Sequence, residues 1–335
     1  MNVERPPPRG VALAGFGVYL PERRVPSEEL DSLFGTPPGW VERATGVRER
    51  RWVRGETTEQ MAACAARRAL VAADVDPDDV GLVIAASASP RQLIPCTAVF
   101  VQRELGLREG GSACFDVDAT CLSWLVALDL AALLVDAGRH RAILVVTCET
   151  ASCSLNPREP ESAGLFGDAA VATVVTRSRG AASAIGCPSF ETHSSGANLA
   201  EFVGAGTRHH PNDSATRAEM NMFHMQGKAL VKMARRIVPP FLDRYFTATG
   251  ASRCDYGVVV PHQASRLGVG ALTERFGFTP AQVVSNLATR GNCIAASIPL
   301  AFAEAVEAGR IARGDRVLLL GSGAGVTLGA MDLVY

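Results

Sequence analysis

Short apolar runs alternate along the chain with longer segments in which apolar residues recur at the period of a helix. In the first half, the runs typical of buried strands lie at residues 11–20, 80–89, 112–119, 141–149 and 169–175. Between them, residues 57–73 and 121–138 repeat Ala, Leu and Val about every 3.6 residues, which predicts helices. This alternation predicts an α/β fold in which helices cover sheets.

The second half shows the same alternation in the same order. Strands are predicted at residues 256–263, 283–288, 316–323 and 326–335, and helices at residues 222–246 and 297–309. We interpret the repeat as an internal duplication, with halves 1–178 and 179–335 that join near residues 177–182. A pseudo-two-fold axis would then place Cys121 opposite the region 291–293 and bring two helix starts together.

Composition narrows the class of protein. The chain has 335 residues, of which 47% are hydrophobic and 20% charged, as in a well-buried globular protein. No apolar run reaches the roughly 18 residues of a membrane helix, and the start lacks the apolar core of a secretion signal, so we expect a cytoplasmic protein without a membrane partner. The net charge of -1 gives no reason to expect nucleic-acid binding.

Nine cysteines occur without paired C-x-x-C spacing, which argues against a disulfide framework and a zinc ribbon. Cys121 differs from the other eight because "DATCLSW" joins a predicted strand to a predicted helix. The N-terminus of a helix stabilises a thiolate and lowers its pKa, which makes a nucleophile. The alternative for any single cysteine is a small buried packing residue, and we assign that role to the other eight.

Two polar residues stand out in the second half. His262 ends the strand "YGVVVPH", and crevices of α/β proteins open at the carboxyl ends of strands. Asn292 follows a glycine and precedes an apolar helix, so an ordinary helix cap is its simplest role. His224 falls within a predicted helix, and His209 with His210 is a weak metal signal.

Taken together, "DATCLSW", "VVVPHQAS" and "GNCIAASIP" resemble, in order and spacing, the Cys, His and Asn triad of β-ketoacyl-acyl carrier protein synthase III in the thiolase superfamily. The segments "GWVERATGVRERR", "LFGDAAVA", "GKALVK" and "GSGAGVTLGA" add to the resemblance, which covers nearly the whole chain. It implies a layered αβαβα fold made of two thiolase-like halves, the first carrying Cys121 and the second His262 and Asn292.

The resemblance also implies a reaction. Cys121 would take an acyl group from acyl-coenzyme A, and malonyl-acyl carrier protein would lose carbon dioxide and attack that acyl group. His262 and Asn292 would donate hydrogen bonds to the enolate that decarboxylation creates. The backbone N–H groups of Cys121 and of Ala324 to Gly325 would hold the second oxyanion.

Coenzyme A and carrier-protein thioesters would be substrates, and no metal or other cofactor is implied. The glycine-rich stretches "GFGVYLP" and "GSGAGVTLG" match neither a dinucleotide fingerprint nor a phosphate loop.

Substrate-binding residues follow from the same resemblance. Trp40 matches the tryptophan that stacks on adenine near the tunnel entrance. Arg43 and Arg266 each stand one residue earlier than the family's arginines. Lys232 lies on a predicted basic helix face. Such a face suits the acidic surface of a carrier protein or the phosphates of coenzyme A, and it suits an ordinary solvated surface equally well. Its neighbours on that face are Lys228 and either Arg235 or Arg236.

Ile94 separates this chain from a related branch of the family. The resemblance implies a homodimer in which residues 92–97 reach the partner's tunnel, and Ile94 would shape the acyl end of that site. Enzymes that join two acyl-coenzyme A molecules head to head carry a glutamate at this place. Decarboxylative condensation is therefore the favoured reaction, with acyl transfer to an alcohol or amine, head-to-head condensation and a silent carrier-protein binder as alternatives.

Overall fold

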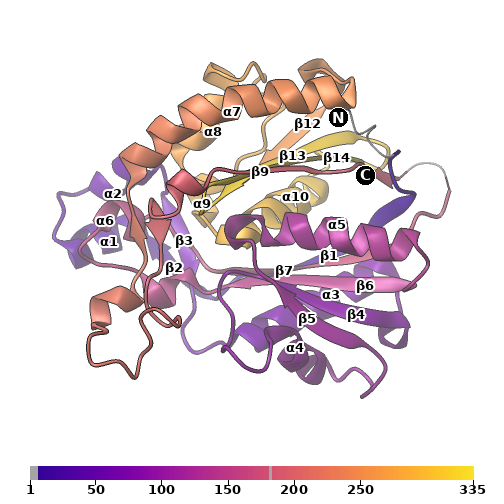
Figure 1. Cartoon of the computed structure of the whole chain (residues 1–335), viewed down its shortest axis with the longest axis horizontal. Helices are drawn as coiled ribbons and strands as arrows, with labels where there is room; N and C mark the ends of the chain where they lie inside the picture. Colours follow the sequence, from indigo (N-terminus) through magenta and orange to yellow (C-terminus); the bar gives the residue numbers. More distant parts are fainter. Residues whose placement is uncertain (1–6, 181–182) are drawn as a thin grey trace.

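The computed structural model describes residues 7–180 and 183–335, which build two mixed sheets with helices between and outside them (Figure 1). The first sheet has the strand order β1-β7-β6-β4-β5. Strand β4 runs parallel to β5 and β6, whereas β7 is antiparallel to both β6 and β1. The strands are β1 (Val11–Tyr19), β4 (Val80–Ala86), β5 (Ala113–Val117), β6 (Ala142–Glu149) and β7 (Ala169–Arg177).

The second sheet repeats this arrangement. Strand β12 is parallel to β13, β14 is antiparallel to β13, and both β8 and β9 are antiparallel to β14. The strands are β8 (Ala184–Ile185), β9 (Ser189–Thr192), β12 (Val258–Pro261), β13 (Arg316–Gly323) and β14 (Thr327–Val334). The repeated topology is what a duplication produces. The division at 178/179 stays a prediction, and the last residues of the expected join, 181–182, lie outside the described residues.

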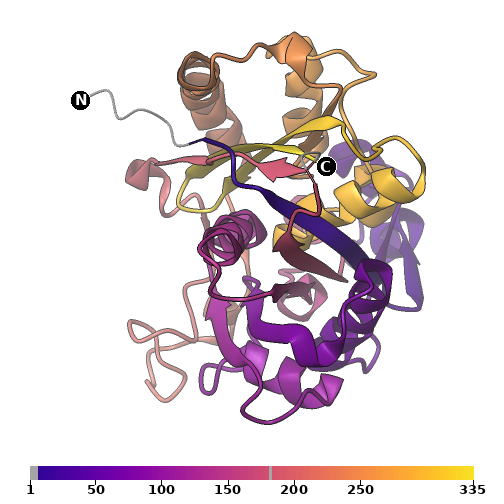
Figure 2. The ribbon, with the colours of Figure 1, turned by 90° about the vertical axis from the view of Figure 1, so that its right-hand side faces the viewer.

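Helices form three layers around the sheets (Figures 1 and 2). Helices α5 (Ser123–Asp136) and α10 (Ser297–Glu307) lie between the sheets and share one apolar core with strands of both. Helices α3 (Thr58–Ala73) and α4 (Thr97–Leu105) pack on the outer face of the first sheet. Helices α7 (Gly227–Thr249) and α8 (Arg266–Glu274) cover the second. The αβαβα prediction is confirmed.

Helix α3 illustrates how the sequence sets this packing. Thr57 and Gln60 form a reciprocal capping box that satisfies backbone donors at the start of the helix. Its alanine-rich face lies directly on β1, where a Cβ on Gly17 would come within 2.0 Å of the Ala65 carbonyl oxygen. Glycine in the strand and alanine in the helix therefore allow the two backbones to touch.

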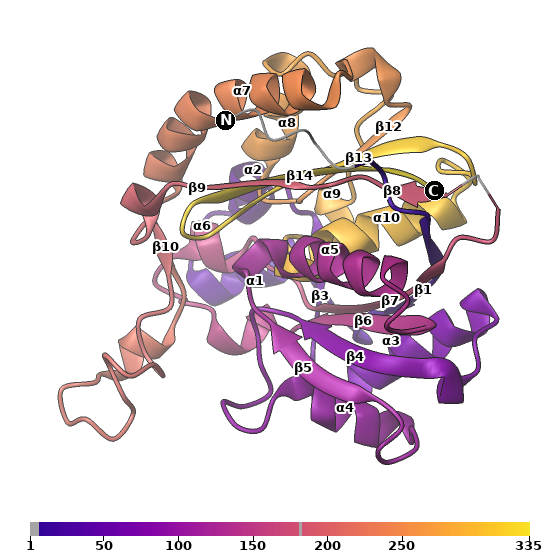
Figure 3. The ribbon, with the colours of Figure 1, turned by 45° about the vertical axis from the view of Figure 1, so that its right-hand side comes forward.

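Smaller elements flank the layers (Figure 3). Strands β2 and β3 pair antiparallel, and β10 pairs with β11. No helix in the described ranges is long and apolar enough to cross a membrane. The elements are β2 (Arg23–Pro26), α1 (Ser27–Phe34), α2 (Trp40–Thr45), β3 (Glu49–Trp52), α6 (Pro160–Ala163), β10 (Ala200–Glu201), β11 (His224–Met225) and α9 (Leu287–Arg290).

Two predicted elements were wrong in part. The strand expected at 283–288 is reduced to one bridge between Val283 and Val259. The Ser285 hydroxyl donates to Gln263 Oε1 at 3.0 Å instead, and Asn286 Nδ2 donates to Glu304 at 2.8 Å, so side chains turn the chain toward α9.

The helix expected from residue 222 begins only at Gly227, and His224 lies in β11 instead. A contact distant in sequence explains the difference, because His224 Nδ1 lies 2.7 Å from Glu159 Oε1.

Candidate active site

Cys121 lies in a single helical turn, η2 (Thr120–Leu122), between β5 and α5. Thr120 adopts a φ of 53°, a left-handed conformation that is uncommon for a residue with a Cβ. Local hydrogen bonds hold it there. The Thr120 N–H donates to Asp118 Oδ1 at 2.8 Å, and Ser123 Oγ accepts from the Ala119 N–H at 2.9 Å.

Strand β13 comes from the other half and touches this turn. A Cβ on Gly323 would lie 2.5 Å from Thr120 Oγ1 and 3.6 Å from the Cys121 nitrogen. A Cβ on Gly321 would lie 2.5 Å from Leu122 Cδ2 and 3.5 Å from the Cβ of His262. Real side chains could not occupy these positions, so the glycines of "GSGAG" bring the two halves into contact at the thiol.

The thiol of Cys121 does not have the lowered pKa that its place near a helix start predicted. Burial raises the pKa of Cys121 to about 12, and the charge of Glu149 adds to the rise. The backbone N–H groups of Ala324 and Cys121 face the sulfur and oppose it. Desolvation therefore outweighs the effect of the helix terminus on this thiol. The expected oxyanion donors of Cys121 and Ala324 do meet at the sulfur, while Gly325 is not among its donors.

His262 directly follows β12, and its backbone N–H donates to the Leu320 carbonyl at 2.7 Å. Its ring is buried, which lowers the pKa of His262 to about 4. Its Nδ1 atom has no hydrogen-bond partner among the described residues. The imidazole is therefore neutral near pH 7, so it carries one N–H donor and no charge.

Asn292 lies between α9 and the turn η7 (Ile294–Ala296). Its backbone pairs with the "LFGD" segment of the first half, since the Gly167 N–H donates to the Asn292 carbonyl at 3.1 Å. Asn292 Oδ1 accepts from the Ile294 N–H at 2.9 Å, and Nδ2 donates to the Ala264 carbonyl at 3.3 Å. Asn292 is thus tied to the loop that carries His262.

The pseudo-symmetry places Cys121 opposite a different residue from the one expected. Ser297 Oγ accepts from the Cys293 N–H at 3.0 Å, as Ser123 Oγ does from Ala119. Counting from these serines, Cys121 corresponds to Ala295 rather than to residues 291–293. The two alignments differ because the structure matches the turns by their backbone hydrogen bonds, whereas the sequence comparison matched them by their glycine and cysteine residues.

Three of the predicted substrate-binding residues gather at one place. Trp40 and Arg43 lie on α2, and the Arg266 guanidinium at the start of α8 donates to the Arg43 carbonyl at 3.3 Å. The Arg43 guanidinium itself donates to the Pro38 carbonyl. Lys232 is exposed on α7, and no hydrogen bond or ion pair links it to this group within the described ranges. Ile94 is 84% exposed in the loop between β4 and α4.

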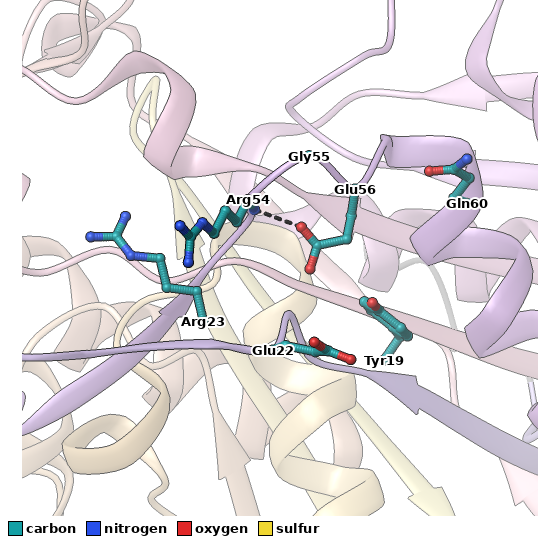
Figure 4. A pocket seen from close by; sticks show the side chains of 7 residues that line it. All are labelled: Tyr19, Glu22, Arg23, Arg54, Gly55, Glu56 and Gln60. Atoms are coloured by element: carbon teal, nitrogen blue, oxygen red, sulfur yellow. Dashed lines mark hydrogen bonds between the residues drawn. The ribbon is translucent and has the colours of Figure 1, made fainter.

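Two features of the structure were not anticipated. Glu149, at the end of β6, is a fully buried carboxyl beside the candidate site, which a strand of eight buried residues ending in an acid could have signalled. A surface cavity of about 600 Å³ lies apart from all the predicted residues (Figure 4). Its lining comes from residues 19–60 and includes Tyr19, Glu22, Arg54 and Glu56, with both signs of charge.

Comparison with known proteins agrees with the geometry. The family model described as 3-oxoacyl-[acyl-carrier-protein (ACP)] synthase III matches residues 115–196, and its C-terminal model matches residues 246–335. A β-ketoacyl-[acyl-carrier-protein] synthase III of Thiobacillus denitrificans is 36% identical over 96% of this chain and 98% of its own. The Aquifex aeolicus relative is 32% identical over 97% of this chain and 100% of its own.

A solved structure of the Aquifex aeolicus enzyme superposes with a TM-score of 0.86, covering 98% of this chain and 100% of that one at 32% identity. Fold, element order and sequence all agree over the full length. The chain therefore belongs to the β-ketoacyl-acyl carrier protein synthase III family of the thiolase superfamily, and it is a condensing acyltransferase.

Proposed function

We propose that this enzyme condenses an acyl-coenzyme A primer with malonyl-acyl carrier protein, and that Cys121, His262 and Asn292 carry the reaction. In the first step the Cys121 thiol attacks the primer thioester, loses its proton, and coenzyme A leaves as a free thiol. In the second step the malonyl carboxylate leaves as carbon dioxide, and the resulting enolate attacks the acyl carbonyl. The Cys121 thiolate then leaves and recovers a proton.

One observation carries this proposal. Gly321 lies within contact range of both Leu122, beside the nucleophile, and His262, while Asn292 bonds to Ala264 two residues further on. The neutral imidazole and the amide of Asn292 supply N–H donors of the kind that stabilise an enolate oxygen. The N–H groups of Ala324 and Cys121 face the sulfur. The carbonyl oxygen of an acyl group bound to that sulfur would lie beside them and would carry the second oxyanion. A base is not required, because loss of carbon dioxide generates the carbanion.

A labelled substrate tests the proposal. Malonyl-acyl carrier protein carrying a labelled free carboxyl should release labelled carbon dioxide only when an acyl-coenzyme A donor is present. Without malonyl, the donor should leave an acyl mass on Cys121 and form no carbon–carbon bond. If the acyl group instead moves to an added alcohol or amine with no release of label, acyl transfer replaces condensation. If two acyl-coenzyme A molecules couple, head-to-head condensation replaces it.

The active form is proposed to be a homodimer. Strand β5 forms the edge of the first sheet, and its residues are only partly buried. The nearby loop exposes Leu93 and Ile94, 75% and 84% accessible, which is costly for apolar side chains in water. Ile94→Glu should shift the enzyme toward monomer in light scattering. Leu33→Glu on α1, another exposed apolar site with 64% accessibility, should not. An unchanged dimer in the first variant would contradict the proposal.

We propose that Trp40, Arg43 and Arg266 together bind coenzyme A and that Lys232 binds the carrier protein. We also propose that the enzyme needs no further cofactor and acts in the cytoplasm. Arg266→Ala should raise KM for acyl-coenzyme A and leave kcat nearly unchanged, because a charge that binds both ground and transition state acts on KM. Arg275→Ala at the other end of α8 is the matched control. Lys232→Ala should raise KM for malonyl-acyl carrier protein alone, and equal effects on both substrates would refute this division.

A further inference from the structure

Glu149 joins three segments that meet beside the candidate site. It is fully buried at the end of β6, and its Oε1 accepts from the Ala88 N–H, in the loop after β4, at 2.9 Å. The Ala295 N–H and the Ser89 side chain also face the carboxyl. Oε2 has no hydrogen-bond partner of regular geometry within residues 7–180 and 183–335. A buried oxygen without a firm partner is costly, so its retention calls for a reason.

The pseudo-symmetry of the two halves shows what Glu149 faces. Ala295 is the counterpart of Cys121, so Glu149 faces the N–H of the empty nucleophile position. In the other turn, the N–H groups of Cys121 and Ala324 face the sulfur. The Glu149 carboxyl therefore accepts from the N–H of Ala295 in the second turn, as the sulfur does from the N–H of Cys121 in the first. This contact fixes η7 directly after Asn292.

The ionisable groups whose pKa values are coupled to that of Glu149 are all acids, so each would be negative when ionised. They are Asp118 and Cys121 of the nucleophile turn, Cys148 of its own strand, and Cys293 of the Asn292 turn. Burial, with Asp118 adding to it, raises the pKa of Glu149 to about 8. A thiolate at Cys121 and a carboxylate at Glu149 therefore disfavour one another.

We propose that Glu149 is a positioning residue of the condensation, which ties the Asn292 turn to the loop after β4 at the place where that turn packs on the Cys121 turn, and whose ionised form opposes loss of the Cys121 proton. The inference rests on the proposed role of Cys121 as acyl acceptor. When Glu149 is protonated, this opposition is absent and the thiol can give up its proton more easily as it attacks the primer. When Glu149 is ionised, the same thiol is held as a neutral S–H group.

The test is the pH dependence of Cys121 alkylation by iodoacetamide, followed by mass spectrometry of the Cys121 peptide between about pH 6 and pH 10, where the rate follows the small thiolate fraction below the midpoint of the thiol. Glu149→Gln keeps the shape and the acceptor for Ala88 but removes the charge. It should react at the wild-type rate below about pH 8, where Glu149 is protonated, and faster than the wild type above it, by up to roughly tenfold, which corresponds to one pKa unit. Glu149→Asp should return the profile toward that of the wild type.

Two controls separate charge from structure. The exposed Cys254 in the same digest should show an unchanged profile in every variant. Asp168→Asn removes another buried carboxyl, which acts on Cys148 and Cys293 but is not among the groups that shift Cys121, so the Cys121 profile should stay. A ratio of Glu149→Gln to wild-type rates that is the same at every pH would overturn the inference.

The wild-type enzyme provides a second measurement if Glu149→Gln does not fold. Two coupled groups broaden the alkylation profile beyond that of one proton, so a curve that fits a single ionisation would also overturn the inference. The proposed function fails differently, since wild-type Cys121 would then gain no acyl mass from acyl-coenzyme A. Proton linkage predicts how the stability of the fold depends on pH. Because folding raises the pKa of Glu149 from 4.5 to about 8, the protonated carboxyl adds to the free energy of unfolding fully below pH 4.5, and this contribution is lost as the pH rises through 8.

The melting temperature of the wild type should accordingly fall relative to that of Glu149→Gln over this window. A constant difference between the two proteins would contradict a buried, protonated carboxyl.

Discussion

The turn before α5 and the turn before α10 have the same backbone design but different chemistry. Each begins with a side-chain oxygen that accepts from a backbone N–H two residues ahead, Asp118 at 2.8 Å and Asn292 at 2.9 Å. Each continues through a residue with positive φ, 53° at Thr120 and 47° at Ile294. The helix then begins with a serine whose hydroxyl accepts from the residue four positions before it.

The differences between the turns assign the roles. An amide can accept through Oδ1 and donate through Nδ2 at once, whereas an ionised aspartate only accepts. Asn292 can therefore hold its turn and still offer a donor to the substrate, while Asp118 can only hold its turn. Three positions further on, the first turn has the thiol of Cys121 and the second has Ala295, whose N–H faces the Glu149 carboxyl. One backbone motif thus carries the proposed nucleophile in one half and the proposed enolate donor in the other.

The largest effect should come from the thiol itself. Cys121→Ala should abolish the acyl-enzyme, because thioester exchange needs the sulfur. Cys293→Ala, in the opposite turn, should retain it, since that thiol is buried and its pKa is raised further by burial. Intact-mass spectrometry after incubation with acyl-coenzyme A reports both. An acyl mass on the Cys121→Ala protein would break the assignment of roles to the two turns.

The next effect separates two roles of the Asn292 side chain, which are to stabilise its own turn and to donate a hydrogen bond to the substrate. Asn292→Asp converts this turn to the chemistry of the first, keeping the acceptor for Ile294 but losing the Nδ2 donor. Decarboxylation of labelled malonyl should fall about a hundredfold, about 2.7 kcal/mol, as when one oxyanion donor is removed. Acylation of Cys121 should stay nearly normal. A variant that decarboxylates at the wild-type rate would show that Asn292 only caps its turn.

A smaller effect is expected where β13 touches the first turn. Gly323→Ala places a Cβ 2.5 Å from Thr120 Oγ1 and 3.1 Å from the Ala119 carbonyl oxygen. Overpacking of this kind costs about 1–3 kcal/mol, and it should slow acylation by displacing Cys121. Chemical denaturation and acylation rates measure the two effects. Gly257→Ala, where no atom lies within 4 Å of the new Cβ, should change neither, and a similar loss there would remove the argument for contact.

The smallest effect compares the two serines. Ser123→Ala leaves the Ala119 N–H without its acceptor, and Ser297→Ala does the same to the Cys293 N–H. Each loss should cost about 1 kcal/mol of unfolding free energy. Kinetics should distinguish them, because the first loosens the Cys121 turn and slows acylation, whereas the second loosens the Asn292 turn and slows decarboxylation. Identical kinetic profiles for the two variants would mean that the turns do not divide the reaction.

Much of the fold and of the site could be predicted from the sequence because the relevant signals are local. Apolar periodicity identified the strands of the first sheet, strands β12, β13 and β14 of the second, and the helices between them, and its repetition along the chain indicated the duplication. Cys121 and His262 each follow a predicted strand and Asn292 precedes an apolar helix, so their places at junctions between elements could be predicted from the sequence. The glycines of residues 321–325 could be recognised as a motif in the sequence. Their structural role, the close approach of β13 to the Cys121 turn, could not.

What the tertiary structure decided depends on residues that are distant along the chain. The pKa of Cys121 is raised rather than lowered because burial between the halves and the charge of Glu149 outweigh the local helix terminus. His224 lies in a strand because Glu159 holds it, and residues 283–288 leave the sheet because Gln263 and Glu304 bind their side chains. Desolvation and such contacts are properties of packed surfaces, so no window of sequence contains them.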